Sequence, residues 1–252
     1  MNKYLQNLSR IEFVVTMACT GKCKHCSQGD HSLGGKPIDK NIAADAVRKI
    51  AEKYNITSVM TFGGEPLLYP ETVCEIHKAA TEMGIPKRQL ITNGHFTKDL
   101  AKISLVAFML KRSGVNEILL SADAFHQEAI PLPYVKVFAE TVISEGIPLK
   151  VQPAWLVSPG ADNVWNNKTG EILSDFRKMG IEENEGNIIF PSGNALKYLG
   201  EYFDLTGEEK SPYSENPEDI RAICFSAGGD ILGSNVYEKD IMEILSEYKP
   251  ED

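Results

Sequence analysis

Short runs of β-branched and apolar residues alternate along this chain with longer stretches whose apolar residues recur at helical spacing. Six runs are candidate strands, at 11–15, 58–62, 89–91, 117–120, 149–151 and 187–190. The helix candidates between them include a stripe from Ile42 to Tyr54 behind a possible N-cap at Asp39, and a stripe from Val73 that stops at Gly84. Strands that alternate with helices predict βαβ units and a parallel sheet. We therefore expect an α/β protein of six β/α units.

Each candidate strand ends in polar or glycine residues before the next helix begins. These segments are 19–26, 63–66, 92–94, 121–123, 152–153 and 191–194. Parallel β/α architectures build their ligand site at the carboxyl ends of the strands, so all six segments are expected on one rim. Glycine and proline also punctuate ordinary turns. Turn formation would explain any one of these segments, but it explains six in succession much less well.

The first of these segments holds Cys19, Cys23 and Cys26, and no fourth cysteine lies nearby. A divalent metal or an iron-sulfur cluster normally takes four donors, so three thiolates leave one metal position open. A catalytic metal site needs such an open position. Two other interpretations stay open at this point: a zinc site completed by His25 or His31, and thiols that bind no metal.

The composition changes near residue 204. The segment 204–219 is rich in acidic residues, Gly, Pro and Ser and lacks periodicity, which is typical of a surface connection. Strand-like runs and a final amphipathic stretch follow from residue 222, but they are too short to form a domain alone. We expect a barrel over residues 1–203 and, over 204–252, an acidic connection and a small tail that packs on the barrel.

Charge and composition exclude several classes of function. Thirty-five acidic against 26 basic residues give a net charge of -9, and such a surface repels nucleic acid. No apolar run approaches the length that crosses a bilayer, and the first residues lack the apolar stretch of a secretory signal. Five cysteines, three of them in one tight loop, indicate metal binding in a reducing compartment. We therefore expect a cytoplasmic protein that binds neither nucleic acid nor membrane and acts on a small molecule or a peptide.

Two motifs together carry a family resemblance. One is the cysteine loop, with His25 directly before its third cysteine, and the other is the Gly-Gly-Glu-Pro segment 63–66 after the second strand. Over residues 9–195 the chain resembles the radical S-adenosylmethionine (radical SAM) enzymes. The resemblance implies a partial (β/α)6 TIM-like barrel with a short C-terminal appendage. It also implies one 4Fe-4S cluster on the three cysteines, with the amine and carboxylate of SAM on the open iron.

In this family the reduced cluster cleaves SAM, and the 5'-deoxyadenosyl radical abstracts hydrogen from the substrate. The resemblance implies SAM contacts from successive strand ends. Gly63 and Gly64 would leave room for the methionyl amine, and Glu65 would supply a charge for its ammonium form. Ser121 and Asp123 would bind the ribose, although Asp123 would look the same as a helix N-cap.

The remaining contacts implied by the resemblance have ordinary structural alternatives. Asn93 and Gln152 would reach the ribose and the carboxylate of SAM, but turn or cap roles stay open. Ile189 and Phe190 would contact adenine, and buried core residues would look the same. His25 would lie against the adenine or the cluster rather than ligate it.

Two cysteines lie outside the loop. Cys74 falls on an apolar helical stripe and is expected to be a small buried side chain. The tail around Cys224 resembles a truncated form of the cysteine-rich C-terminal extensions (SPASM or twitch) of peptide-modifying radical SAM enzymes, without their further cysteines. We therefore expect one cluster only. Some peptide epimerases of the superfamily return a hydrogen atom from a thiol, so Cys224 is a candidate hydrogen donor, with a buried thiol as the alternative. His126 and Glu128 follow the ribose segment and are candidate acid-base residues or plain surface residues.

The expected function is therefore that of a radical SAM enzyme acting on a peptide or small molecule, with an electron donor such as flavodoxin or ferredoxin. A glycyl-radical enzyme activase is one alternative, because such activases are similarly short and also hold a single cluster. An alternative of another class is a non-catalytic iron-sulfur or zinc sensor or electron carrier. Formation of 5'-deoxyadenosine by the reduced protein distinguishes the enzymes from a sensor or carrier.

Overall fold

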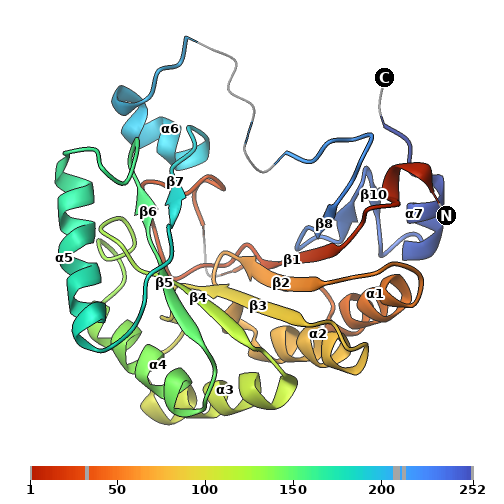
Figure 1. Cartoon of the computed structure of the whole chain (residues 1–252), viewed down its shortest axis with the longest axis horizontal. Helices are drawn as coiled ribbons and strands as arrows, with labels where there is room; N and C mark the ends of the chain where they lie inside the picture. The colour runs from red at the N-terminus through yellow and green to blue at the C-terminus, as the bar shows by residue number, and fades with distance from the viewer. Residues whose placement is uncertain (1, 32–33, 207–210, 212–213, 251–252) are drawn as a thin grey trace.

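A computed structural model gives the fold of the chain and describes residues 2–31, 34–206, 211 and 214–250. A six-stranded parallel sheet forms its centre, in the order β5-β4-β3-β2-β1-β8 (Figure 1). The strands are β1 (Arg10–Thr16), β2 (Ser58–Gly63), β3 (Lys87–Thr92), β4 (Glu117–Ser121), β5 (Leu149–Gln152) and β8 (Ala222–Phe225). The predicted α/β fold with a partial barrel is confirmed.

Helices cover the outer, convex side of the curved sheet, as Figure 1 shows for α1 to α4. They are α1 (Lys40–Lys53), α2 (Pro70–Glu82), α3 (Leu100–Ser113), α4 (Leu132–Ser144), α5 (Val164–Lys178), α6 (Gly193–Leu199) and α7 (Ile241–Glu247). Short 3-10 helices occur at Lys3–Leu5, Pro66–Leu68 and Gly200–Tyr202. The predicted N-cap of the first long helix is confirmed, because Asp39 accepts hydrogen bonds from the backbone N–H groups of Asn41 and Ile42.

The alternation of side chains along β1 separates the two faces of the sheet. Ile11, Phe13 and Val15 are fully buried in the core between sheet and helices. Glu12 and Val14 point to the opposite, inner face, where cavities adjoin the sheet. The core therefore lies between the convex face of the sheet and the helices, and the inner face adjoins cavities that can hold ligands.

The last predicted strand of the barrel differs from expectation. Residues 187–190 form only a short strand, β7 (Asn187–Ile188), which pairs with β6 (Ala154–Trp155) in a separate two-stranded sheet. Pro153 separates β6 from β5, and proline cannot donate to a ladder, so the sheet is interrupted there. The parallel β6–β7 pair nevertheless continues the barrel beyond β5 (Figure 1).

The tail also departs from expectation, because its first strand belongs to the central sheet. β8 pairs in parallel with β1, and the rings of Phe13 and Phe225 stack at 4.6 Å. The hairpin of β9 (Asp230–Ile231) and β10 (Ser234–Asn235) and helix α7 follow, and α7 contacts α1. That residues 204–252 form a separate unit stays a prediction. Part of its acidic connection, 207–210 and 212–213, lies outside the described residues.

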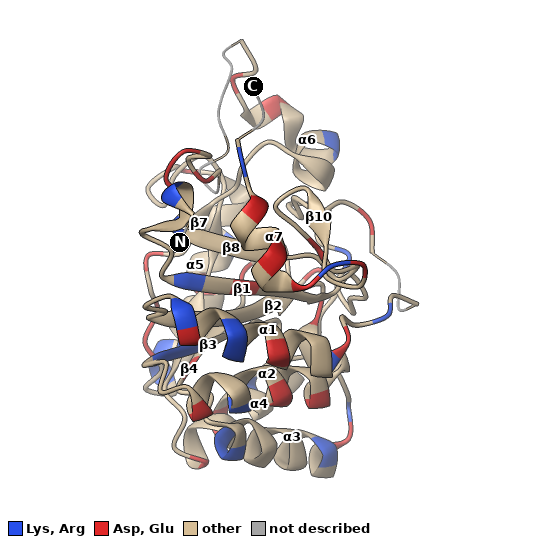
Figure 2. Ribbon diagram, turned by 90° about the vertical axis from the view of Figure 1, so that its right-hand side faces the viewer, with Lys and Arg blue, Asp and Glu red and all other residues tan. Residues whose placement is uncertain are grey.

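Charged residues of both signs are interspersed over the helices seen in Figure 2. In the described part of the chain, no helix combines the length and the apolar character needed to span a membrane.

Candidate functional site

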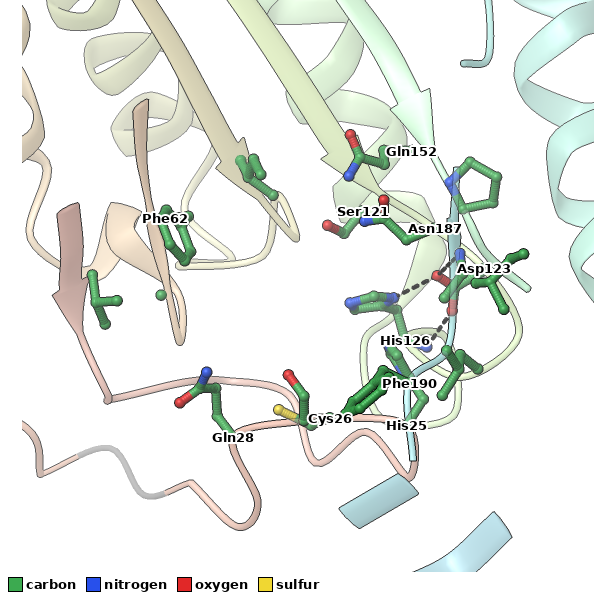
Figure 3. Close-up of a pocket in the computed structure, with 18 residues that line it drawn as sticks. His25, Cys26, Gln28, Phe62, Ser121, Asp123, His126, Gln152, Asn187 and Phe190 are labelled. Atoms are coloured by element: carbon green, nitrogen blue, oxygen red, sulfur yellow. Dashed lines mark hydrogen bonds and ion pairs between the residues drawn. The ribbon is translucent and has the colours of Figure 1, made fainter. Parts of the chain in front are cut away.

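The carboxyl ends of the strands open into two adjoining pockets. The strand-end pocket has a volume of about 240 Å³, and the cysteine pocket beside it has about 100 Å³. Cys26, Gly63, Ser121 and His126 line both, so the two pockets form one continuous space. Figure 3 shows side chains from several strand ends and from the cysteine loop converging on the strand-end pocket. Five of the six segments expected on one rim line this space, and the sixth, 191–194, contacts the cysteine loop instead.

Cys19, Cys23 and Cys26 all line the cysteine pocket. Burial raises the pKa of the Cys19 thiol to about 11 and also raises the pKa of the Cys23 thiol above its ordinary range. Thiols buried in this way ionise when a bound metal supplies positive charge, so the three form a soft donor set for metal. This donor set fits a cluster that takes three thiolates and leaves one iron for another ligand.

The start of α6 holds the cysteine loop, a role that the sequence analysis missed. Asn194 donates its backbone N–H to the carbonyl of Cys26 at 2.9 Å and its side-chain amide to the carbonyl of Cys23 at 3.3 Å. Gly193 has a φ of 54°, and a Cβ atom there would lie 2.4 Å from the carbonyl oxygen of Ser27. The turn therefore requires glycine. The signal available in the sequence was the position of Gly193 and Asn194 at a strand end.

Two histidines of the loop make different contacts. His31 places Nδ1 2.8 Å from the carbonyl oxygen of Met17 and Nε2 3.1 Å from the sulfur of Cys26. His25 instead packs against the rings of Phe125 and His126, with centroids 5.0 and 4.7 Å away. Burial lowers the pKa of His25 to about 4, so this ring is neutral. Its predicted position against the adenine or the cluster stays a prediction.

Gly63 and Gly64 are required by the close approach of two strand ends. A Cβ atom on Gly63, which has a φ of 134°, would lie 2.6 Å from the carbonyl oxygen of Thr16. A Cβ atom on Gly64 would lie 2.2 Å from the carbonyl oxygen of Ala18. Both contacts are to the backbone that leads into Cys19, so the glycines place the cysteine loop as well as lining its pocket. Their predicted contact with the methionyl amine stays a prediction.

We expect Gly64→Ala to lower the free energy of unfolding by about 1–3 kcal/mol, because the new methyl group forces two backbone segments apart. Gly170→Ala is the matched control. Gly170 lies within α5 with no atom within 4 Å of an added Cβ, so alanine there should stabilise by roughly 0.5–1 kcal/mol. Urea unfolding of the two variants measures both effects. Equal stability of Gly64→Ala and the parent would contradict the close approach.

Glu65 joins the ends of two strands. Its side chain is fully buried and lines neither pocket. The carboxylate accepts hydrogen bonds from the backbone N–H of Leu67 (2.9 Å), the hydroxyl of Thr92 (2.7 Å) and the backbone N–H of Asn93 (2.8 Å). These partners tie the end of β2 to the end of β3. Glu65 therefore positions the two strand ends, and its predicted charge for the ammonium of SAM stays a prediction.

Asn93 reaches the cysteine loop directly. Its amide nitrogen lies 3.7 Å from the sulfur of Cys19 and 3.2 Å from the hydroxyl of Thr20, and its amide oxygen accepts from the backbone N–H of His95. The predicted contact with SAM and the alternative turn role are thus not exclusive. One end of the amide closes the turn and the other faces the cysteine pocket, which Asn93 lines.

Asp123 lines the strand-end pocket, and its predicted contact with the ribose of SAM stays a prediction. The side chain is fully buried, and one oxygen accepts from the backbone N–H groups of Phe125 and His126 at 2.9 and 3.0 Å. The other oxygen accepts from the backbone N–H of Ala154 at 3.0 Å and lies 2.8 Å from Nδ1 of His126. Burial alone would raise its pKa, but His126 and these hydrogen bonds hold the pKa below its usual range. The carboxylate is thus engaged by protein donors, as in the N-cap alternative.

His126, the partner of Asp123, also presents its ring to the site. An ionised carboxylate only accepts hydrogen bonds, so Nδ1 of His126 carries the hydrogen that Asp123 accepts. Among the described residues, Nε2 has no hydrogen-bond partner, and the ring lines both pockets. Figure 3 shows it pointing into the cavity, near Ser121. His25, Asp123 and His126 lie close enough together to hold a metal ion, but two of the three already bind each other.

The other predicted SAM contacts line the strand-end pocket. Ser121, Gln152, Ile189 and Phe190 all border it. The side-chain oxygen of Gln152 accepts from the amide of Asn184 at 3.1 Å. Ile189 is buried and packs in a small cluster beside the main core, so the core alternative holds for its side chain. The roles of these residues toward SAM stay predictions.

The two other cysteines lie away from the cysteine pocket. Cys74 is half-buried and packs against the main core, as expected. Cys224 lies in β8 opposite Glu12, is exposed, and lines neither pocket. It sits at the edge of the sheet rather than over the mouth of the barrel, because β8 pairs with β1. The alternative of a buried thiol is therefore wrong for Cys224, and its role as hydrogen donor stays a prediction.

Comparisons with known proteins agree with this architecture. Among curated proteins, a probable GTP 3',8-cyclase of Saccharolobus solfataricus is 30% identical over 228 residues, which covers 83% of this chain and 69% of that protein. A probable GTP 3',8-cyclase of Methanocaldococcus jannaschii is 25% identical over 127 residues, covering 50% of this chain and 40% of the relative.

Two solved structures share the fold. Native anSMEcpe with bound AdoMet gives a TM-score of 0.59 at 14% identity, over 94% of this chain and 80% of that one. BtrN in complex with AdoMet and 2-DOIA gives a TM-score of 0.51 at 16% identity, over 94% and 81%. The family profile of the radical SAM superfamily matches residues 13–143. The chain thus belongs to the radical SAM superfamily and is an enzyme whose cofactors are a 4Fe-4S cluster and SAM.

Proposed function

We propose that this enzyme abstracts a hydrogen atom from a peptide or small-molecule substrate, using SAM cleaved at a cluster on Cys19, Cys23 and Cys26. The observation that supports this most is the shared space. Three thiols with no fourth cysteine beside them line one end, and the strand ends of the barrel line the other. When bound, the cluster and SAM supply the electron and the carbon radical for hydrogen abstraction.

The residues of the chain position these groups and exclude water. Glu65 and Asn93 join the second and third strand ends to the cysteine loop, and Asn194 fixes the loop from α6. The buried Asp123 orients the ring of His126 at the junction of the two pockets. Rigid positioning of this kind matters because a radical formed in the wrong geometry reacts with solvent or protein. Electrons would come from a flavodoxin or ferredoxin.

The likeness to GTP 3',8-cyclases makes GTP the first small molecule to test. The anaerobically reconstituted, dithionite-reduced protein would be incubated with SAM and either GTP or pooled synthetic peptides, each deuterated at carbon. The true substrate should raise 5'-deoxyadenosine above the substrate-free level, and deuterium should appear in its 5'-methyl group. SAM cleavage that transfers deuterium from neither source would contradict hydrogen abstraction from these two classes. Deuterium transfer from a glycine of a large glycyl-radical enzyme would instead support the activase alternative.

A further inference from the structure

A third cavity, which we call the barrel cavity, lies on the inner face of the sheet and has a volume of about 470 Å³. It shares Phe62, Ile91, Gln152 and Asn187 with the strand-end pocket, so it continues that pocket down the inside of the barrel. Its opposite end is lined by residues from the amino ends of the strands. None of the motifs of the site accounts for it.

The charges of the barrel cavity lie at that opposite end. Arg10 of β1, Lys87 of β3 and Lys150 of β5 supply three cations, and Glu12 and Glu117 supply two carboxylates. The lining thus carries one more positive than negative charge, in a chain whose net charge is -9. A local excess of cations in an acidic protein favours an anionic ligand at this point.

Each cation has a partner that leaves part of its hydrogen-bonding capacity unused. Nε of Arg10 forms an ion pair with Glu12 at 2.5 Å, and Nη2 of Arg10 donates to the thioether sulfur of Met60 at 3.1 Å, which is a weak acceptor. Nζ of Lys87 lies 3.6 Å from a Glu117 oxygen that already accepts from the amide of Gln89. Nζ of Lys150 lies 3.7 Å from Glu182, whose side chain is 79% exposed. Surface ion pairs at such distances contribute little. Within the part of the chain that the structure describes, each cation therefore keeps N–H donors for a ligand.

The length of the strands sets how far this end lies from the reaction site. Arg10 and Val14 are four residues apart on β1, and Lys87 and Ile91 are four apart on β3. Val14 and Ile91 line the strand-end pocket. A parallel strand rises about 3.3 Å per residue, so the backbones of Arg10 and Lys87 lie about 13 Å from the strand-end pocket. Lys150 is two residues from Gln152, which also lines that pocket, so its backbone lies about 7 Å away. A ligand that reaches Arg10 and Lys87 is longer than a free amino acid.

We propose that the barrel cavity binds the far end of the substrate and that this end carries a carboxylate or phosphate group about 7–13 Å from the strand-end pocket, where the reacting carbon lies. This inference rests on the proposed function, because it assigns the reacting carbon to the strand-end pocket. An anion at the far end would be bound by Arg10, Lys87 and Lys150, and Glu12 would disfavour a second negative charge beside it.

Isothermal titration calorimetry of the anaerobically reconstituted holoenzyme tests this at constant ionic strength, with citrate as carboxylate probe and pyrophosphate as phosphate probe. The variants are Arg10→Gln and the double variant Lys87→Gln/Lys150→Gln, whose lysines are half exposed and whose loss leaves the core intact. Lys78→Gln is the matched control, since Lys78 lies on α2 and its side chain is 59% exposed.

We expect at least one probe to bind the parent and Lys78→Gln with equal affinity, and to bind both cavity variants at least 10-fold more weakly. The preferred probe identifies the group as a carboxylate or a phosphate. Absence of binding to the parent, or equal binding to parent and cavity variants, would overturn the proposal. Cleavage of SAM by the parent is measured separately. If the parent cleaves SAM but binds neither anion, only this inference is rejected. If the parent does not cleave SAM, the proposed function is rejected.

Discussion

Asp123→Ala is expected to lower the free energy of unfolding by about 3–5 kcal/mol at neutral pH, the cost of removing one partner of a buried charged network. The carboxylate has no exposure and accepts from three backbone N–H groups and from His126, and alanine leaves all four donors buried without it. Its pKa is below the ordinary value in the folded state, so its stabilisation is complete above the ordinary carboxyl pKa and is lost as the pH falls toward the folded value.

Urea unfolding of the anaerobic apoprotein, followed by circular dichroism, measures the loss. Glu128→Ala is a suitable control because Glu128 forms a half-exposed ion pair with Lys24 nearby, and such pairs contribute less than about 1 kcal/mol. A change below about 1 kcal/mol for Asp123→Ala would contradict the buried network.

Glu65→Gln is expected to remove a pH dependence of stability. Burial raises the pKa of Glu65 to about 7, above its ordinary value of 4.5, although three hydrogen bonds oppose the rise. Between these two values the folded state binds a proton that the unfolded state does not bind. The free energy of unfolding therefore falls as the pH rises through this window, by about 3 kcal/mol in total. Glutamine has the shape of the protonated side chain and carries no titrating group.

The free energy of unfolding of the apoprotein would be measured at pH 5 and pH 7.5 for parent and variant. Taking the difference between parent and variant cancels the contributions of other groups, such as His77, whose pKa burial lowers to about 3. We expect the parent to lose about 2–2.5 kcal/mol relative to Glu65→Gln between the two pH values, because pH 5 to 7.5 covers only part of the transition. A constant difference would show that the three donors hold Glu65 ionised throughout.

Local patterns were sufficient to predict most of the central sheet. The β-branched runs correspond to β1 to β5, and the apolar stripe behind Asp39 is α1, because both depend on residues adjacent in sequence. The pairing of β8 with β1 joins residues more than 200 positions apart. Local patterns carry no information about such a partner, so the addition of β8 to the central sheet was not predicted. Pro153 is present in the sequence, but the sequence analysis did not predict that the sheet would be interrupted at this residue.

The positions of the site residues were easier to predict than their roles. Strand ends meet in any parallel barrel, so Ser121, Asn93 and Gln152 were correctly expected on one rim. Glu65 and Asp123 were expected to bind SAM because of the resemblance to the family, and that role stays a prediction. The hydrogen bonds that these carboxylates accept from other strands were not predicted, because the donors Asn93 and Ala154 lie 28 and 31 positions away in sequence.

Formation of 5'-deoxyadenosine tests the central claim most directly, namely that Cys19, Cys23 and Cys26 hold a cluster at which SAM is cleaved. Parent, Cys26→Ala and the control Cys74→Ala would be reconstituted anaerobically, reduced with dithionite and incubated with SAM. Cys74 packs against the core on α2, away from the cysteine pocket. We predict that the parent and Cys74→Ala form 5'-deoxyadenosine in equal amounts, each together with methionine. Cys26→Ala should form no 5'-deoxyadenosine. No 5'-deoxyadenosine from the parent, or undiminished formation by Cys26→Ala, would contradict the claim.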